Sequence, residues 1–184
     1  MNYVLMVSGV VLGVCLVYYF IIYNVLVRLN NKVKEAFATM DVYLKKRWDL
    51  IPNLVETVKG YAKHEKDTLK EIVELRNKNY DSLSLNEKLK ANEEINKGIY
   101  NLMALVENYP DLKANENFLS LSRELSSIED EIAQSRKYYN AVVRKFNDKV
   151  EMVPSNIVAK TMGYKTKEMF SVTENERKAV KVEL

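Results

Sequence analysis

The sequence predicts an all-α protein: an N-terminal transmembrane helix followed by an antiparallel four-helix bundle of long helices. The chain has 184 residues but only five Gly and three Pro, whereas a β-sandwich or barrel needs turn residues about every 8–12 positions. Its first 27 residues carry no charged side chain, so all 28 Lys and Arg and all 25 Asp and Glu lie in the remainder. In that remainder, apolar residues recur at the three- and four-residue spacing of helix faces.

The first element is the membrane helix. Residues 4–23 are long enough, at about 1.5 Å per residue, to cross the roughly 30 Å of bilayer hydrocarbon. Tyrosines at 18, 19 and 23 suit the aromatic belt at a membrane interface. A cleaved signal peptide would need a basic start, a shorter apolar core and a small-x-small site, which this segment lacks. A lipoprotein-type site at Cys15 is a weaker alternative, because Val14 rather than a small residue precedes the cysteine.

The charges that flank this helix predict its orientation. The 20 residues after residue 27 carry six Lys and Arg, and the N-terminal flank carries none. The positive-inside rule therefore predicts a protein of the cell membrane with its short N-terminus outside and its bundle in the cytoplasm. Gly9 and Gly13 form a G-x-x-x-G pattern through which two such helices could meet. The net charge of +3 is too small to indicate a nucleic-acid partner.

The bundle helices follow in order. The membrane helix runs on through Leu26, Val33 and Leu44 without Gly or Pro. At Asp49 and Pro52 we expect a turn rather than a kink, with Asp49 capping the second helix. The apolar face of that second helix is Leu54, Val58, Tyr61, Leu69, Ile72, Val73 and Tyr80.

Two further helices complete the predicted bundle. Ser84 and Glu87 fit a capping box that opens the third helix, which Pro110 closes. The fourth has a seam that steps by three and four like a coiled coil. Its members are Phe118, Leu121, Leu125, Ile128, Ile132, Ser135, Tyr139, Val142 and Phe146. The predicted division is a transmembrane anchor at 1–27, a four-helix bundle at 28–163, and a short helix or frayed tail at 164–184.

The sequence predicts no catalytic residue, no cofactor site and no metal site. With His64 as the one histidine and Cys15 as the one cysteine, ferritin-like metal sites and Ser-His or Cys-His chemistry lack their partners. His64 is expected on a solvated face. An all-carboxylate site drawn from Glu71, Glu74, Glu129 and Glu131 stays open as a minor alternative. The Lys45–Arg47 triplet is expected to be the solvated end of the first bundle helix, too far from the membrane to bind lipid.

Residues 41–65, DVYLKKRWDLIPNLVETVKGYAKHE, closely resemble the signature of the LemA family of bacterial proteins. Segments 23–37, 107–121 and 129–147 agree in order, and GYKTKEMF with VKVEL is similar to the family's C-terminal pattern, although Met169 stands at its second aromatic position. The resemblance implies one N-terminal span followed by a cytoplasmic helical bundle. It implies no established catalytic activity, no cofactor and no agreed active site.

Two functional hypotheses follow, beside the minor carboxylate-enzyme alternative. The first is a membrane-anchored, non-catalytic interaction or scaffold protein, whose bundle binds a protein partner and whose residues 4–23 contact the lipid bilayer. The predicted turn segments 48–53 and 109–115, with the aromatic residues Trp48 and Tyr109, are candidate contact surfaces. The second is a structural protein that self-associates as a homo-oligomer through G-x-x-x-G and the bundle edges.

Overall fold

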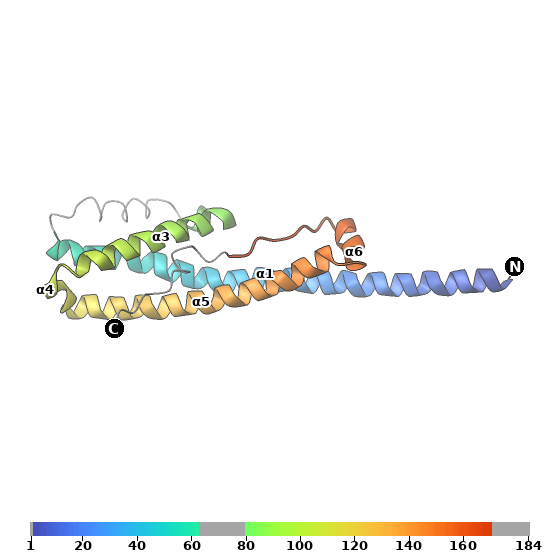
Figure 1. Cartoon of the computed structure of the whole chain (residues 1–184), viewed down its shortest axis with the longest axis horizontal. Coiled ribbons are helices and arrows are strands. Elements are labelled where there is room, and N and C mark those ends of the chain that lie inside the picture. The colour runs from blue at the N-terminus through green and yellow to red at the C-terminus, as the bar shows by residue number, and fades with distance from the viewer. Residues whose placement is uncertain (1, 63–79, 171–184) are drawn as a thin grey trace, which may run out of the picture. The chain divides into compact units, whose positions relative to one another are not determined.

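A computed structural model describes residues 2–62 and 80–170 of the chain (Figure 1). All regular structure in these ranges is helical, which confirms the predicted fold class. The elements are α1 (Asn2–Tyr61), the 3-10 helix η1 (Tyr80–Ser82), α3 (Leu85–Val106), α4 (Pro110–Lys113), α5 (Glu116–Glu151) and α6 (Ser155–Thr161). The number of bundle helices stays a prediction, because residues 63–79, which hold most of the expected second helix, lie outside the described residues.

The chain divides into two compact units, and the long helices α1 and α5 contribute to both. Unit 1 consists of residues 1–38 and 135–184, and unit 2 of residues 39–134.

Polar contacts fix the directions of the helices in unit 2. The side chains of Lys88 and Asn92 on α3 contact Asp41 and Arg47 on α1, so α3 runs parallel to α1. α5 runs antiparallel to α1, because Asn115, just before α5, donates to the Tyr61 hydroxyl at the end of α1, and Glu129, further along α5, pairs with Arg47, earlier in α1. The predicted capping box opens α3: the Ser84 backbone N–H donates to the Glu87 carboxylate at 2.8 Å.

The predicted turn at Asp49–Pro52 is wrong, because α1 continues through Pro52 to Tyr61. An interior proline costs about 3 kcal/mol, since it removes one backbone hydrogen bond and its ring crowds the preceding turn. Burial on both sides offsets that cost: Ile51, Leu54 and Val58 are buried and continue the apolar face that begins before the proline. Asp49 is therefore an interior helix residue, which accepts from Lys45 Nζ at 2.7 Å, and caps no second helix.

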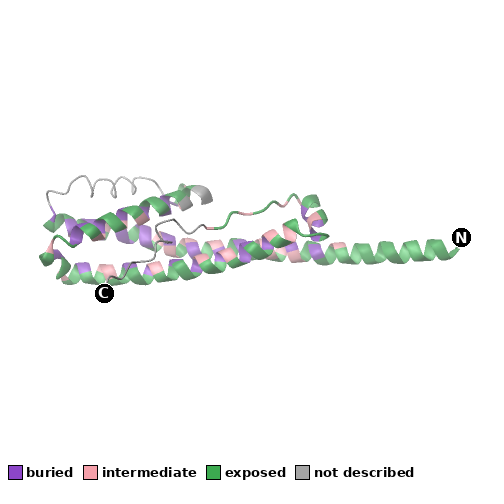
Figure 2. Ribbon diagram, viewed as in Figure 1, coloured by how far each residue is buried: buried purple, intermediate pink, exposed green. Residues whose placement is uncertain are grey.

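The seam predicted for the fourth helix lies along α5. Eight of its nine members are buried, and Leu121 is half-buried. The same repeat forms the core of both units, with Phe118 to Ile132 in unit 2 and Ser135 to Phe146 in unit 1. Figure 2 shows this buried stripe on α5 and its counterpart on α1.

The first part of α1 is a candidate membrane span. It is long and apolar enough to cross a membrane, and only 6% of its most apolar stretch is buried. In Figure 2 this stretch is almost entirely exposed. The exposure ends at Ile22 and Leu26, which are buried within unit 1. Residues 2–21 therefore lack a protein core of their own, as a helix surrounded by lipid would.

The short helix that follows α5 is α6, and a glycine ends it. Gly163 has φ of 70°, a conformation that glycine adopts without steric cost. The Gly163 and Tyr164 N–H groups donate to the Lys160 and Ala159 carbonyls at 3.1 and 3.0 Å, which is the Schellman pattern of a helix end. The chain then turns back, and residues 164–170 run without helical structure (Figure 1).

Candidate functional site

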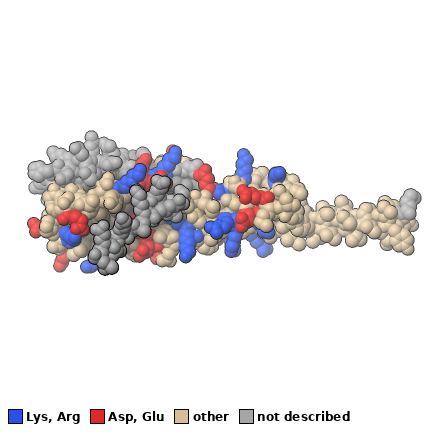
Figure 3. All heavy atoms as spheres, viewed as in Figure 1, with Lys and Arg blue, Asp and Glu red and all other residues tan. Residues whose placement is uncertain are grey.

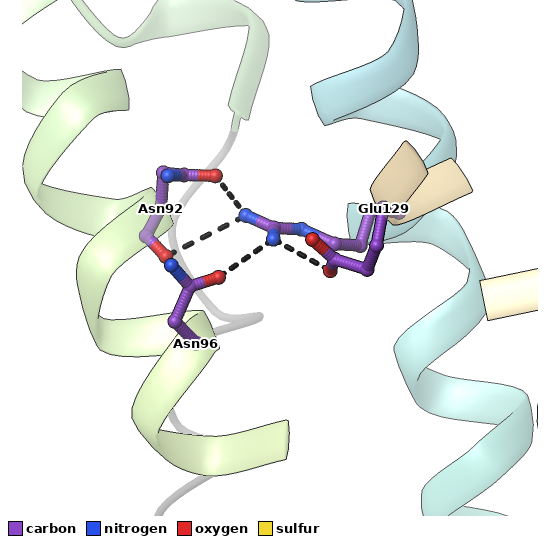
Figure 4. A network of polar contacts seen from close by, with 4 residues as sticks. Asn92, Asn96 and Glu129 are labelled. Atoms are coloured by element: carbon purple, nitrogen blue, oxygen red, sulfur yellow. Dashed lines mark hydrogen bonds and ion pairs between the residues drawn. The ribbon is translucent and has the colours of Figure 1, made fainter. Parts of the chain in front are cut away.

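Among the described residues of unit 2, the most deeply buried polar side chain is that of Arg47, which is 1% exposed. It links three helices (Figure 4). Nη1 donates to Asn96 Oδ1 on α3 and to Glu129 Oε1 on α5, each at 2.7 Å. Nη2 donates to Asn92 Oδ1, and its distance to the Asn92 carbonyl oxygen is 3.5 Å. Arginine suits this position because its planar fork presents several donors in fixed directions.

The prediction that the Lys45–Arg47 triplet forms a solvated helix end is therefore wrong for Arg47. Helix periodicity explains the difference, because position 47 faces the core between Leu44 and Ile51, whereas Lys46 is exposed. The acceptors that make burial tolerable come from α3 and α5, which lie far away in sequence. Among them, Glu129 was a candidate carboxylate for a metal site, and its pairing with Arg47 gives it a structural role.

A second polar cluster surrounds Tyr80. Its hydroxyl donates to Asp41 at 2.7 Å, and Lys88 Nζ lies 2.6 Å from the other oxygen of the same carboxylate. The rings of Tyr80 and Trp48 pack with centroids 5.3 Å apart. Burial, assisted by Asp41, raises the pKa of Tyr80 well above its usual value. The tyrosine is therefore a neutral hydrogen-bond donor that holds η1 and α3 against α1.

A groove of about 660 Å³ lies between α1 and α5 in unit 2. Its charged lining consists of the carboxylates Asp49, Glu124 and Glu131 and the cation Lys46, and its floor includes the buried Leu50 and Ile128. The negative charge of Glu131 raises the pKa of the Tyr43 phenol at its edge. The groove thus combines an acidic rim with an apolar floor, a surface suited to a basic segment.

Glu131, another carboxylate predicted for a metal site, lines the groove. Glu71, Glu74 and His64 lie outside the described residues. In residues 2–62 and 80–170, no cluster of three or more His, Cys, Asp and Glu could hold a metal ion. Of the two aromatic turn segments, 48–53 lies inside α1, and its Trp48 is buried; 109–115 contains α4, whose Leu112 is also buried. The buried Trp48 and Leu112 stabilise the core, whereas Asp49, Leu50 and Asn53 of the first segment line the groove.

Sequence reasoning missed a strap in unit 1, formed by residues 164–170 along α5. The Asn140 amide pairs with the backbone N–H and carbonyl of Phe170, both at 2.9 Å. The Asn147 amide does the same with Lys167, at 2.9 and 2.8 Å. The Tyr139 and Phe170 rings meet edge to face, with centroids 5.4 Å apart. The available signal was two asparagines seven residues apart, each directly after a seam residue.

The structure thus defines an all-helical protein whose helices are joined by polar clusters and whose first helix has a candidate membrane span. The chain belongs to the LemA family: the family profile matches residues 36–184. It is similar to Protein LemA of Metamycoplasma hominis, with 31% identity over 158 residues, which cover 84% of this chain and 71% of that protein.

Similarity extends to magnetosome proteins. Magnetosome protein MamQ 2 of Paramagnetospirillum magneticum is 24% identical over 174 residues, and magnetosome protein MamQ of Magnetospirillum gryphiswaldense is 23% identical over 174 residues. In both cases the match covers 80% of this chain and 64% of the magnetosome protein. The family and these relatives support a membrane-associated protein of the LemA type.

Proposed function

We propose that this protein is a non-catalytic scaffold of the bacterial cell membrane, anchored by one span, with its helical bundle in the cytoplasm and its short N-terminus outside. The observation that carries the proposal is the division of α1: residues 2–21 are mostly apolar and, apart from the half-buried Tyr19, exposed, and the residues beyond them contribute to the core of a charged helical domain. Positive charges after the span and none before it support the orientation.

The acidic groove is the proposed contact with the protein partner. Asp49, Glu124 and Glu131 outnumber its one lysine, so a basic segment with an apolar side chain would match both rim and floor. In contrast, the Arg47 and Tyr80 clusters direct their polar groups inward. They hold the helices that form the groove in place.

A photo-crosslinking experiment in living cells tests this partner. A photoreactive amino acid at Asn53, in the groove, should form an adduct with a second protein, and Glu124→Gln with Glu131→Gln should reduce that adduct. Glu93→Gln with Asp130→Asn is the matched control, because both residues are exposed outside the groove. An equal loss of adduct in both variants, or adducts with this chain alone, would contradict a separate basic partner at the groove.

Self-association is a second candidate, favoured by the open face around Gly13. A shallow hollow of about 510 Å³ lies on α1 over residues 10–21, and a methyl group added at Gly9 or Gly13 would meet no atom within 4 Å. Two copies could therefore approach closely along this face. Light scattering of the purified protein in detergent tests it: a dimer that Gly9→Leu with Gly13→Leu dissociates supports self-association, and a monomer removes it.

A further inference from the structure

The α5–α6 connection lies beside the end of the candidate span. The Thr161 Oγ1 atom at the end of α6 is 3.2 Å from the Tyr19 hydroxyl on α1. Tyr19 lies four residues before the predicted end of the span at residue 23, about 6 Å along the helix axis. The contact therefore places α6 at the depth of the membrane interface if α1 spans the bilayer.

The outer side of this connection is apolar and exposed. Met152, Val153 and Ile157 are 59%, 78% and 62% exposed, whereas Val158 and Ala159 on the other face of α6 are buried. A short helix in contact with water on that side would normally present polar residues. We name these three exposed residues the apolar tip.

Unit 1, which holds the apolar tip, is richer in basic than in acidic residues, although Glu151, next to Met152, is exposed as well. The described part of unit 1 beyond the span, residues 28–38 and 135–170, has eleven Lys and Arg against four Asp and Glu. The same comparison over residues 39–62 and 80–134 gives nine against fourteen, so the positive charge belongs to unit 1. In Figure 3, Lys and Arg, with some Asp and Glu among them, lie near the uncharged stretch of α1. Arg28, Lys32 and Lys160 are exposed, and Lys149 is half-buried.

We propose that the apolar tip is a second membrane contact, which inserts into the interface of the same bilayer that α1 spans while exposed lysines and arginines of unit 1 bind anionic lipid phosphates. The proposal rests on the proposed span. Apolar side chains beside a basic face are the combination that holds interfacial helices in anionic membranes. The tip and the span together would fix the depth and tilt of unit 1, which a single helix leaves free to vary.

Depth measurements on the full-length protein in vesicles test the tip. In a Cys15→Ser background, a spin label is attached to a single cysteine at Val153. A label at Tyr138 is the control, because Tyr138 lies on α5, is exposed like Val153, and has no exposed large apolar residues next to it in the sequence. A third label at Val14 reports the span. In vesicles of phosphatidylcholine and phosphatidylglycerol, labels at 153 and 14 should collide more with oxygen than with a water-soluble nickel complex, and the label at 138 should show the reverse.

Charge is tested in the same vesicles. One basic residue near an anionic surface shifts a membrane equilibrium about fivefold, so Lys149→Gln with Lys160→Gln should reduce the inserted population at 153, and vesicles of phosphatidylcholine alone should do the same. Lys97→Gln with Lys137→Gln is the matched control and should change little. Insertion that ignores both the lipid charge and the lysines would overturn the anionic-lipid contact.

The labels separate this inference from the proposed function. If 14 reports lipid while 153 behaves like 138, the apolar tip is wrong and the span stands. If 14 itself reports water, the span and the inference fail together.

Discussion

Replacement of Arg47 tests whether the buried network stabilises unit 2. In Arg47→Met, the aliphatic part of the side chain is largely preserved, but Asn92, Asn96 and Glu129 lose their donor. Asn92 is buried and cannot recover water, at a cost of about 1–3 kcal/mol for an unsatisfied buried group. Glu129 is 39% exposed, so its carboxylate rehydrates, and the full 3–5 kcal/mol for breaking a buried ion pair does not apply.

We therefore expect Arg47→Met to lower the free energy of unfolding by about 2–3 kcal/mol. That corresponds to a fall in Tm of about 4–12 °C for a domain of this size, measured by circular dichroism in detergent. Arg47→Lys keeps the charge but not the planar fork of donors, so its Tm should lie between those of the wild type and Arg47→Met. Lys46→Met is the matched control on the exposed side of α1 and should stay within about 0.5 kcal/mol. If Arg47→Met melts with the wild type, the network contributes no net stability.

Three further outcomes follow from the buried contacts. Ile128→Asp puts an unpaired carboxylate into the α5 seam, at a cost of several kcal/mol, and should unfold unit 2. Ser127→Asp, at the exposed neighbouring position, should not. Equal melting curves of the two variants would show that Ile128 is not part of the core. Deletion of residues 1–18 should leave a soluble, mainly helical protein. The protein that lacks residues 1–27 should be less stable than that one by about 1.5–3 kcal/mol for each of Ile22 and Leu26, because both side chains are buried. Identical denaturant midpoints of the two shortened proteins would contradict that burial. Burial and Asp41 raise the pKa of Tyr80 above its usual 10.0, so the contribution of Tyr80 to stability is complete below pH 10 and is lost above it. Between pH 9 and 11 the wild type should therefore lose stability more steeply than Tyr80→Phe, by up to about 1.4 kcal/mol per pH unit. Parallel pH profiles of the two proteins would contradict this.

Local patterns in the sequence predicted most of the fold. The seam of α5 was visible because burial repeats along one helix face, and the Ser84–Glu87 box because its partners are three residues apart. The uncharged stretch before Arg28 could be identified from amino-acid composition alone. Each of these signals lies within one element.

The errors arose where distant segments decide the outcome. Pro52 reads as a helix breaker, and only the core on both sides of it explains why α1 continues. Arg47 reads as one of three adjacent cations, and only Asn92, Asn96 and Glu129 make its burial tolerable. Likewise, the strap requires Asn140 and Asn147 to meet a segment about 20–30 residues later, for which the sequence has no simple periodic signal.

The central claim is a single span with the helical domain in the cytoplasm, and cysteine accessibility in whole cells tests it most directly. In a Cys15→Ser background, single cysteines are placed at Asn2 and at Ser120, both exposed, and treated with a membrane-impermeant thiol reagent. The account predicts labelling at residue 2 in intact cells and at residue 120 only after the membrane is opened. Labelling of residue 120 in intact cells would place the helical domain outside and contradict the account.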